Sequence, residues 1–178
     1  MTGAEIRALL REQFGEAVVS DSEGRDMDSL VVDRKVVRDI SRFLRDDSRT
    51  KMEQLTDITA VDWSGRQTPR FELVVHYYSF THKHRIRLKF PIPEADPVYD
   101  SLSELWACAD WLEREVYDMF GLKANGHPNL RRILTHDDFE GHPLRKEYPV
   151  NRRQGIRPPV TDLLTLRPYP GPGADVKN

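Results

Sequence analysis

Residues 71–90 read FELVVHYYSFTHKHRIRLKF, and this stretch decides the fold. Two runs rich in β-branched and aromatic residues, 71–80 and 85–90, flank the polar residues 81–84. Such composition is typical of β-strands, and a short polar connection between two strands is typical of a hairpin. We therefore expect two adjacent antiparallel strands here.

Further strand patterns precede this hairpin. Residues 55–63 alternate between two faces, and Ser64-Gly65 marks the turn that follows them. Residues 17–19 and 30–32 are short apolar runs on either side of a polar turn, which predicts two more short strands.

Apolar residues at helical spacing predict two helices before the hairpin. Thr2 and Glu5 have the spacing of a capping box that begins the first helix, and Gly15 is placed to end it. Asp33 can cap the second helix, whose apolar side chains run from Val36 to Leu44.

A third helix is predicted after the hairpin. It should begin near Ser101 or Ser103 and run to Phe120, where Gly121 closes it. Helices on both sides of hairpin strands predict an α+β fold, an antiparallel sheet with helices packed on one face. The short connections favour antiparallel pairing over βαβ crossovers. We assign residues 1–121 to this α+β domain.

The composition excludes several classes of protein. The single cysteine among 178 residues, Cys108, cannot form an internal disulfide, a cysteine-ligated iron–sulfur cluster or a thiolate zinc site. Its place near the apolar stripe of the third helix predicts a buried, inert thiol. No run of apolar residues is long enough to span a bilayer, and we expect no signal peptide.

Charge and proline divide the chain near residue 121. Residues 1–120 carry 17 basic and 23 acidic side chains, whereas residues 121–178 carry 10 and 6. Eight of the 12 prolines lie between Pro128 and Pro172, and proline disfavours long helices. We therefore expect residues 122–178 to form an extended basic tail. Its last part, 167–173, is rich in helix breakers and is expected to be disordered unless bound.

Motifs for nucleotide, metal or nucleophilic chemistry are weak. Neither a dinucleotide-binding G-x-G-x-x-G nor a phosphate-binding G-x-x-x-x-G-K-[ST] occurs, and neither does G-x-S-x-G. His82 and His84 belong to a polar hairpin tip, which we interpret as solvated surface. His127, His136 and His142 lie within sixteen residues, without the ligand spacing usual for zinc.

The third helix carries a dense group of charges. On a helical wheel, Glu113 and Glu115 flank the apolar stripe on opposite edges, about 160° apart. A general acid–base pair needs both carboxyls at one bound atom, so these two are interpreted as charged edges that pair with arginines. Arg114 and Asp118 also have the spacing of a helical ion pair.

The tail contains two similar units. Residues 126–132 read GHPNLRR, and residues 141–146 read GHPLRK. A solvated basic tail is the simplest interpretation, but it does not need the leucines, isoleucine and tyrosine interleaved with the charges. Apolar anchors between arginines favour a segment that binds another protein. Nucleic acid is a weaker alternative, because the rest of the chain is acidic and no stacking platform accompanies the arginines.

Five stretches together resemble one known family. They are 55–63 (LTDITAVDW), 111–121 (WLEREVYDMFG), 126–128 (GHP), 130–134 (LRRIL) and 141–149 (GHPLRKEYP). Their combination and order resemble the 30 kDa subunit family of the proton-pumping NADH:quinone oxidoreductase, which is respiratory complex I.

The resemblance implies a structural and assembly subunit of the hydrophilic arm, with an α+β domain and a tail that lies against the quinone-site subunit of the complex. It implies an oxidoreductase complex in which FMN and iron–sulfur clusters belong to partner subunits and this chain holds no cofactor, metal or catalytic residue. It also implies a peripheral location on the cytoplasmic side of a bacterial inner membrane, or on the equivalent matrix side. The expected partner-docking signature is Glu113, Arg114, Glu115, Asp118, Gly121, His127, Pro128, Arg131, Arg132, His142, Pro143, Arg145, Lys146 and Tyr148.

Two alternatives remain open from the residues. The same docking role could serve a membrane-bound hydrogenase or another quinone-linked dehydrogenase. The basic tail could instead belong to a nucleic-acid-binding protein or adaptor, whose affinity would fall steeply with salt.

Overall fold

The protein is described from a computed structural model, which covers residues 2–22, 27–152 and 154. The expectation for residues 167–173 lies outside this range. The elements in chain order are α1 (Gly3–Phe14), η1 (Gly15–Ala17), β1 (Val18–Ser22), β2 (Ser29–Val32), η2 (Arg34–Val36), α2 (Val37–Asp46), β3 (Gln54–Asp62), β4 (Phe71–Ser79), β5 (His84–Ile92), β6 (Val98–Asp100), α3 (Ala109–Phe120) and β7 (Lys123–Asn125), where η marks a short 3-10 helix.

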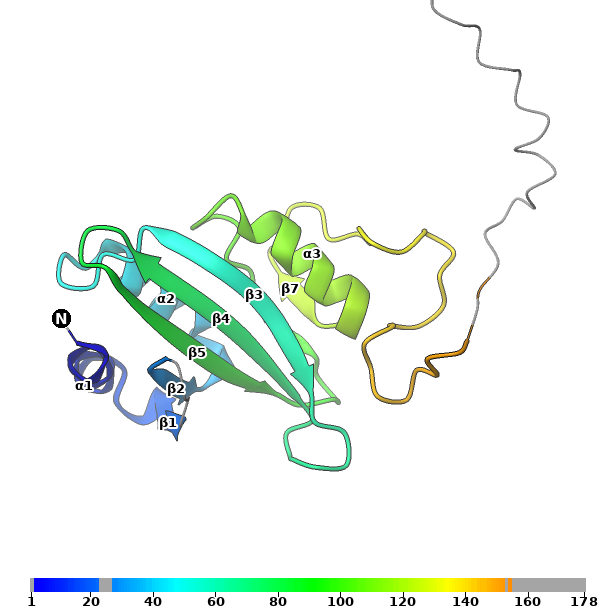
Figure 1. The fold of residues 1–178 in the computed structure, drawn as a ribbon, viewed down its shortest axis with the longest axis horizontal. Helices are drawn as coiled ribbons and strands as arrows, with labels where there is room; N and C mark the ends of the chain where they lie inside the picture. The colour runs from blue at the N-terminus through cyan, green and yellow to red at the C-terminus, as the bar shows by residue number, and fades with distance from the viewer. Residues whose placement is uncertain (1, 23–26, 153, 155–178) are drawn as a thin grey trace, which may run out of the picture.

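The predicted hairpin lies inside a five-stranded sheet of order β1-β2-β5-β4-β3 (Figure 1). β4 and β5 pair antiparallel, with Leu73 opposite Phe90 and Val75 opposite Leu88. These four side chains are fully buried. β3 pairs antiparallel with the other edge of β4, as the alternation of its residues predicts.

The prediction of a purely antiparallel sheet is wrong at one pair of strands. β2 lies next to β5 and runs parallel to it, with Leu30 opposite Leu88. The two strands are separated in the chain by α2, β3 and β4, which supply a connection long enough for parallel pairing. Short connections dictate antiparallel pairing only between strands that follow one another.

In Figure 1, α2 lies behind the sheet, and α1 lies to the left of it, near β1 and β2. Thr2 and Glu5 form the predicted capping box of α1, and Gly15 ends that helix. Asp33 caps the short η2 that leads into α2. Buried side chains of both helices join one core with the sheet.

Helix α3 begins later than predicted, at Ala109. The backbone N–H of Leu102 donates to the Glu113 carboxylate at 2.7 Å, which turns residues 101–108 back beside the helix. A second correction follows from this late start. Cys108 lies at the exposed N-terminal end of α3, and not in its buried stripe.

The chain leaves α3 through a small parallel pair, β6 with β7, in which Tyr99 lies opposite Ala124. Residues 126–152 contain no helix or strand, as the prolines predict. They fold back against α3, as the contacts below show, and in Figure 1 they loop beside it. These residues therefore pack on their own domain, a contact that the expectation of an extended tail did not include.

Candidate functional site

The contact between α3 and residues 126–152 brings most of the predicted signature residues together. α3 supplies Glu113, Arg114 and Asp118, while the tail supplies the two Gly-His-Pro units and their cations. We call residues 126–152 the returning segment.

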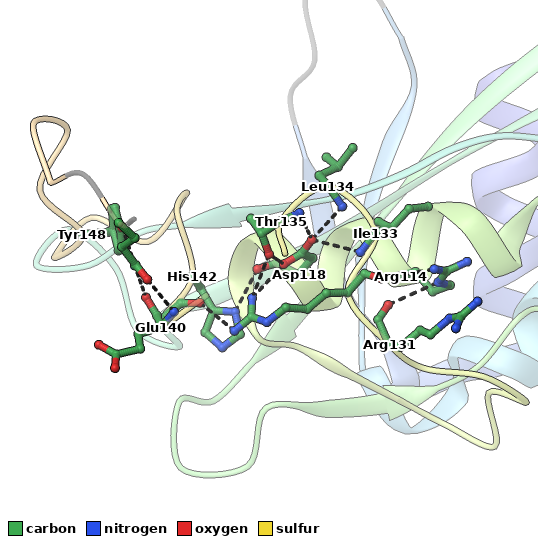
Figure 2. Close-up of polar contacts among 12 residues, drawn as sticks. Arg114, Asp118, Arg131, Ile133, Leu134, Thr135, Glu140, His142 and Tyr148 are labelled. Carbon is green, nitrogen blue, oxygen red and sulfur yellow. Dashed lines mark hydrogen bonds and ion pairs between the residues drawn. The ribbon is translucent and has the colours of Figure 1, made fainter. Parts of the chain in front are cut away.

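Asp118 is the centre of this contact (Figure 2). Its fully buried carboxylate accepts the backbone N–H groups of Ile133, Leu134 and Thr135 at 3.1, 2.8 and 2.8 Å. It also accepts from the Thr135 hydroxyl and from the Arg132 guanidinium, at 2.5 and 2.7 Å. Burial alone would raise the pKa of Asp118, but these donors together lower it well below its usual range. The returning segment is thus held around a buried negative charge.

Arg114 holds the same segment one helical turn earlier. Its guanidinium donates to the carbonyls of Arg131 at 3.2 Å and Arg132 at 3.1 Å, and it lies over the Trp111 ring. The predicted ion pair between Arg114 and Asp118 is absent from the described residues, because each binds the returning segment instead.

The second Gly-His-Pro unit completes the C-terminus of α3. The last carbonyls of a helix have no partner within the helix. Here the Asp118 carbonyl accepts from His142 Nδ1 at 2.9 Å, the Met119 carbonyl accepts from the Leu144 N–H at 3.1 Å, and the Phe120 carbonyl accepts from Arg145 Nε at 2.6 Å. Burial, followed by the nearby arginines, lowers the pKa of His142.

Gly121 makes this close approach possible. It has φ of +77°, the left-handed conformation that glycine adopts freely. A Cβ at this position would lie 2.5 Å from His142 Nε2 and 2.5 Å from an Arg145 nitrogen. Gly121 therefore both ends α3 and admits the returning segment.

The first Gly-His-Pro unit lies at the other end of α3. The side chain of His127 is fully buried, and its Nε2 donates to the Asp110 carbonyl at 3.1 Å. Its Nδ1 accepts the Asn129 N–H at 3.0 Å. His127 is therefore a structural contact, with both ring nitrogens hydrogen-bonded.

Glu113 differs from the prediction. It pairs with no arginine of the described residues; its carboxylate is fully buried and accepts from Ser101 Oγ at 2.6 Å and from the Leu102 N–H at 2.7 Å. The reason is geometric, since the loop before α3, and not a cationic surface, covers this edge of the helix.

The end of the returning segment is tied to the sheet. The Lys146 N–H donates to Asp62 Oδ2 at 2.8 Å, and Arg70 pairs with the same carboxylate at 2.9 Å. Arg70 also pairs with Glu147. The Arg70 guanidinium, chiefly, lowers the pKa of Asp62 to about 2. Sequence reasoning missed Asp62 and Arg70 as site residues, because nothing at the end of a strand or in the loop that follows it indicates a contact with residues 146 and 147.

Tyr148 stabilises the returning segment itself. Its ring stacks on Phe139 with centroids 5.7 Å apart, and its hydroxyl accepts from Gln154. Glu140 in turn is hydrogen-bonded to Gln154 and Arg152. Pro143 is half-buried in the same segment.

Some signature residues face outward instead. Glu115, Arg131 and Lys146 are exposed, and their side chains form no hydrogen bond or ion pair with the described part of the chain. Pro128 is exposed as well. Four large apolar side chains from α3 and the returning segment are also exposed: Trp111 by 60%, Leu134 by 64%, Leu144 by 51% and Val150 by 104%.

The described residues contain neither a grouped set of metal ligands nor a membrane-spanning helix. Within residues 2–22, 27–152 and 154, no three His, Cys, Asp or Glu side chains are grouped as a metal ion would need. No helix in the same ranges is long and apolar enough to cross a membrane.

Known proteins share both the sequence pattern and the fold of this chain. Residues 30–154 match the family model described as respiratory-chain NADH dehydrogenase, 30 Kd subunit. An NADH-quinone oxidoreductase subunit of Geobacter sulfurreducens is 47% identical over 141 residues, which are 79% of this chain and 86% of that protein. The subunit of the same name from Ralstonia pickettii is 43% identical over 175 residues, with 93% and 86% covered.

Two solved structures have a similar fold. A trypsin-resistant fragment of Nqo5 has a TM-score of 0.60 and 25% identity, covering 70% of this chain and 98% of the fragment. A chain of the membrane-bound sulfane sulfur reductase, an archaeal respiratory membrane complex, has a TM-score of 0.69 and 23% identity, covering 84% and 86%. The second likeness concerns the fold alone.

Proposed function

This chain belongs to the family of the 30 Kd subunit of respiratory-chain NADH dehydrogenase, and we propose that within its complex it is a structural subunit that docks against the quinone-site subunit. It is one subunit of NADH-quinone oxidoreductase, an oxidoreductase complex of several chains. The complex is therefore a heteromultimer, and the proposal concerns which neighbour this chain contacts and how.

Outward-facing side chains beside α3 carry the docking proposal. Arg131 and Lys146 are exposed cations whose side chains have no partner in the described part of the chain, and Trp111, Leu134 and Leu144 are exposed apolar side chains of the same part of the molecule. Exposed apolar groups accompanied by arginine are typical of protein interfaces. The inward-facing residues hold the returning segment in a conformation that exposes these cationic and apolar side chains.

The chemistry of the complex is assigned to other subunits. We infer that FMN and the iron–sulfur clusters belong to partner chains, and that this chain contributes no catalytic residue. In support, the two buried carboxyls of α3, Glu113 and Asp118, are both engaged in internal hydrogen bonds. We likewise propose a peripheral position on the cytoplasmic, or equivalent matrix, side of the membrane.

The parent assembly is inferred from sequence rather than from fold. Relatives with 40–48% identity over most of this chain are named as subunits of NADH-quinone oxidoreductase. The fold alone is shared with a chain of a sulfane sulfur reductase, so the fold does not discriminate between related membrane complexes.

Co-purification tests the docking proposal. Arg131→Glu in the tagged full-length chain is expected to reduce the recovered amount of the quinone-site subunit at least tenfold, since it reverses an exposed charge in the proposed interface. Arg66→Glu is the matched control, because Arg66 is an exposed arginine in the loop between β3 and β4. Equal recovery of the quinone-site subunit with both variants would contradict the proposal.

A further inference from the structure

Glu113 is a buried acid with no cation beside it. Its carboxyl is fully inaccessible to solvent, and its only ion-pair contact in the described part of the chain is His127 Nε2 at 4.0 Å. Burying a carboxylate without an opposite charge is costly, which favours the protonated form.

His127 is hydrogen-bonded at both ring nitrogens. Its Nδ1 accepts the N–H of Asn129, so that nitrogen carries no proton. Its Nε2 donates to the Asp110 carbonyl. Both hydrogen bonds of the ring are thus made to backbone groups, and the Asp110 carboxylate also lies 3.1 Å from Nε2.

Two serine hydroxyls can form hydrogen bonds with Glu113 in both of its protonation states. Glu113 Oε2 lies 2.6 Å from Ser101 Oγ, which lies 2.8 Å from Ser103 Oγ, and either oxygen of the serine pair can donate. When Glu113 is ionised, Ser103 donates to Ser101 and Ser101 donates to Glu113. When Glu113 is protonated, it donates to Ser101, which then donates to Ser103. The Leu102 N–H remains on Oε1 in both states.

This hydroxyl pair leads toward the surface. Ser103 is half-buried and lines a surface pocket of about 320 Å³. A proton can therefore reach the buried carboxyl along groups that are already hydrogen-bonded, without opening the core.

The groups that face Glu113 come from every element around it. They are Asp110 on α3, His127 of the returning segment, Tyr99 of β6 and Tyr77 of β4. No lysine or arginine is among these groups, and the buried Tyr99 hydroxyl has no hydrogen-bond partner among the described residues. Burial raises the pKa of Glu113 to about 7, with Asp110 adding to the effect and the bonds from Leu102 and Ser101 opposing it.

We propose that Glu113 is a proton-binding site, served by the Ser101 and Ser103 hydroxyls. This goes beyond a docking role, since it gives a structural subunit its own protonation equilibrium beneath the first Gly-His-Pro unit. The ligand is the proton alone, and no bond other than that to hydrogen forms or breaks.

Carbon-13 NMR of the full chain with labelled glutamate carboxyls tests this inference. Between about pH 4 and pH 9, one glutamate resonance is expected to titrate with a midpoint near pH 7, well above the ordinary range of a glutamate carboxyl. Glu113→Gln should remove that resonance, and Glu115→Gln, the exposed neighbour on the same helix, should leave it unchanged.

Ser101→Ala gives a second test, which does not depend on the folding of Glu113→Gln. This substitution removes a hydrogen-bond donor to the ionised carboxylate. The midpoint of the resonance that titrates near pH 7 should therefore rise by about half a pH unit or more. The inference is overturned if every glutamate titrates below about pH 5.5, if the neutral resonance survives Glu113→Gln, or if Ser101→Ala leaves its midpoint in place.

Discussion

At the scale of single residues, Asp118 and Glu113 show how the groups around a buried carboxyl determine whether its ionised form is favoured. Both are fully buried carboxyls on the same helix. Asp118 receives an arginine, a hydroxyl and three backbone N–H groups, which favour its ionised form. Glu113 receives one hydroxyl and one N–H without a cation, and its pKa moves in the opposite direction.

The Asp118 contact predicts a large loss of stability on neutralisation. Asp118→Asn leaves the half-buried Arg132 without its counter-charge and removes an acceptor from the backbone N–H groups. The free energy of unfolding should fall by about 3 kcal/mol, the range for breaking a buried pair. Chemical denaturation measures this change, with the exposed Glu115→Gln expected to stay within about 0.5 kcal/mol of the unaltered protein. Similar values for both variants would disprove the role of Asp118.

Glu113 is expected to make the protein less stable as pH rises, whereas a carboxylate in an ordinary salt bridge makes it more stable. Its pKa is raised from 4.5 to about 7 on folding, so between these values the folded state binds the extra proton. Its contribution to stability is full below about pH 4.5 and is lost as pH rises toward 7, by about 3 kcal/mol in total.

Glu113→Gln should remove this part of the pH profile. Denaturation midpoints measured from about pH 5 to pH 8 are expected to fall with pH in the unaltered protein and to be flatter in the variant. A profile of the same slope in both proteins would count against a raised pKa at Glu113.

At the scale of elements, the C-terminus of α3 depends on a distant part of the chain. Its carbonyls at positions 118, 119 and 120 are bonded by side-chain and backbone donors from residues 142–145. The Arg145 guanidinium also places positive charge where the helix dipole favours it. The helix end and the returning segment are therefore expected to be stable together or not at all.

Alanine substitutions at two glycines distinguish the cost of backbone strain from the cost of a steric clash. Gly121 and Gly65 both have positive φ, +77° and +71°, but of these two only Gly121 has atoms that an added Cβ would meet. Gly65→Ala should cost about 1 kcal/mol from the left-handed backbone alone. Gly121→Ala should cost at least about 1 kcal/mol more, because His142 and Arg145 must move.

Thermal unfolding of the two glycine variants distinguishes these costs. A larger decrease of Tm in Gly121→Ala than in Gly65→Ala is expected. Equal decreases of Tm would mean that the returning segment accommodates a Cβ at position 121 without loss of stability.

Local signals explain which elements the sequence can predict. The capping box at Thr2, the β-rich runs of the hairpin and the glycine at 121 act on their immediate neighbours, and each prediction is confirmed. The parallel pairing of β2 with β5 depends on contacts far apart in the chain, to which short connections give no guide.

In the candidate site too, local motifs can be predicted from the sequence, whereas contacts between distant residues cannot. The motifs identify the residues of the signature, but they do not tell which of them contact this chain and which contact a partner. An arginine in an irregular segment can bind its own domain or another protein with the same chemistry. Only the fold reveals that Arg132 reaches Asp118, fourteen residues earlier, whereas Arg131 does not. The burial of Glu113 likewise depends on the loop before α3.

At the scale of the whole molecule, the inward and outward arginines should behave differently. The sequence alone predicts that charge reversal at Arg131 or Arg145 reduces assembly more than Tm. The structure changes this expectation for Arg145, which donates to Phe120 and lies over the Phe71 ring.

We expect Arg145→Glu to lower Tm and assembly together, and Arg131→Glu to lower assembly alone. Differential scanning fluorimetry of the isolated chain, beside recovery of the complex on affinity purification, compares the two effects. A decrease of Tm in Arg131→Glu as large as in Arg145→Glu would remove the distinction between inward and outward arginines.

Photo-cross-linking in the assembled complex tests the central claim most directly. A photoreactive amino acid at position 134 replaces an exposed leucine beside the Asp118 contact. The account predicts a cross-link to the quinone-site subunit, identified by mass spectrometry, and no such product from the same group at the exposed position 66. Products confined to this chain, or an equal yield of the quinone-site product from both positions, would contradict it.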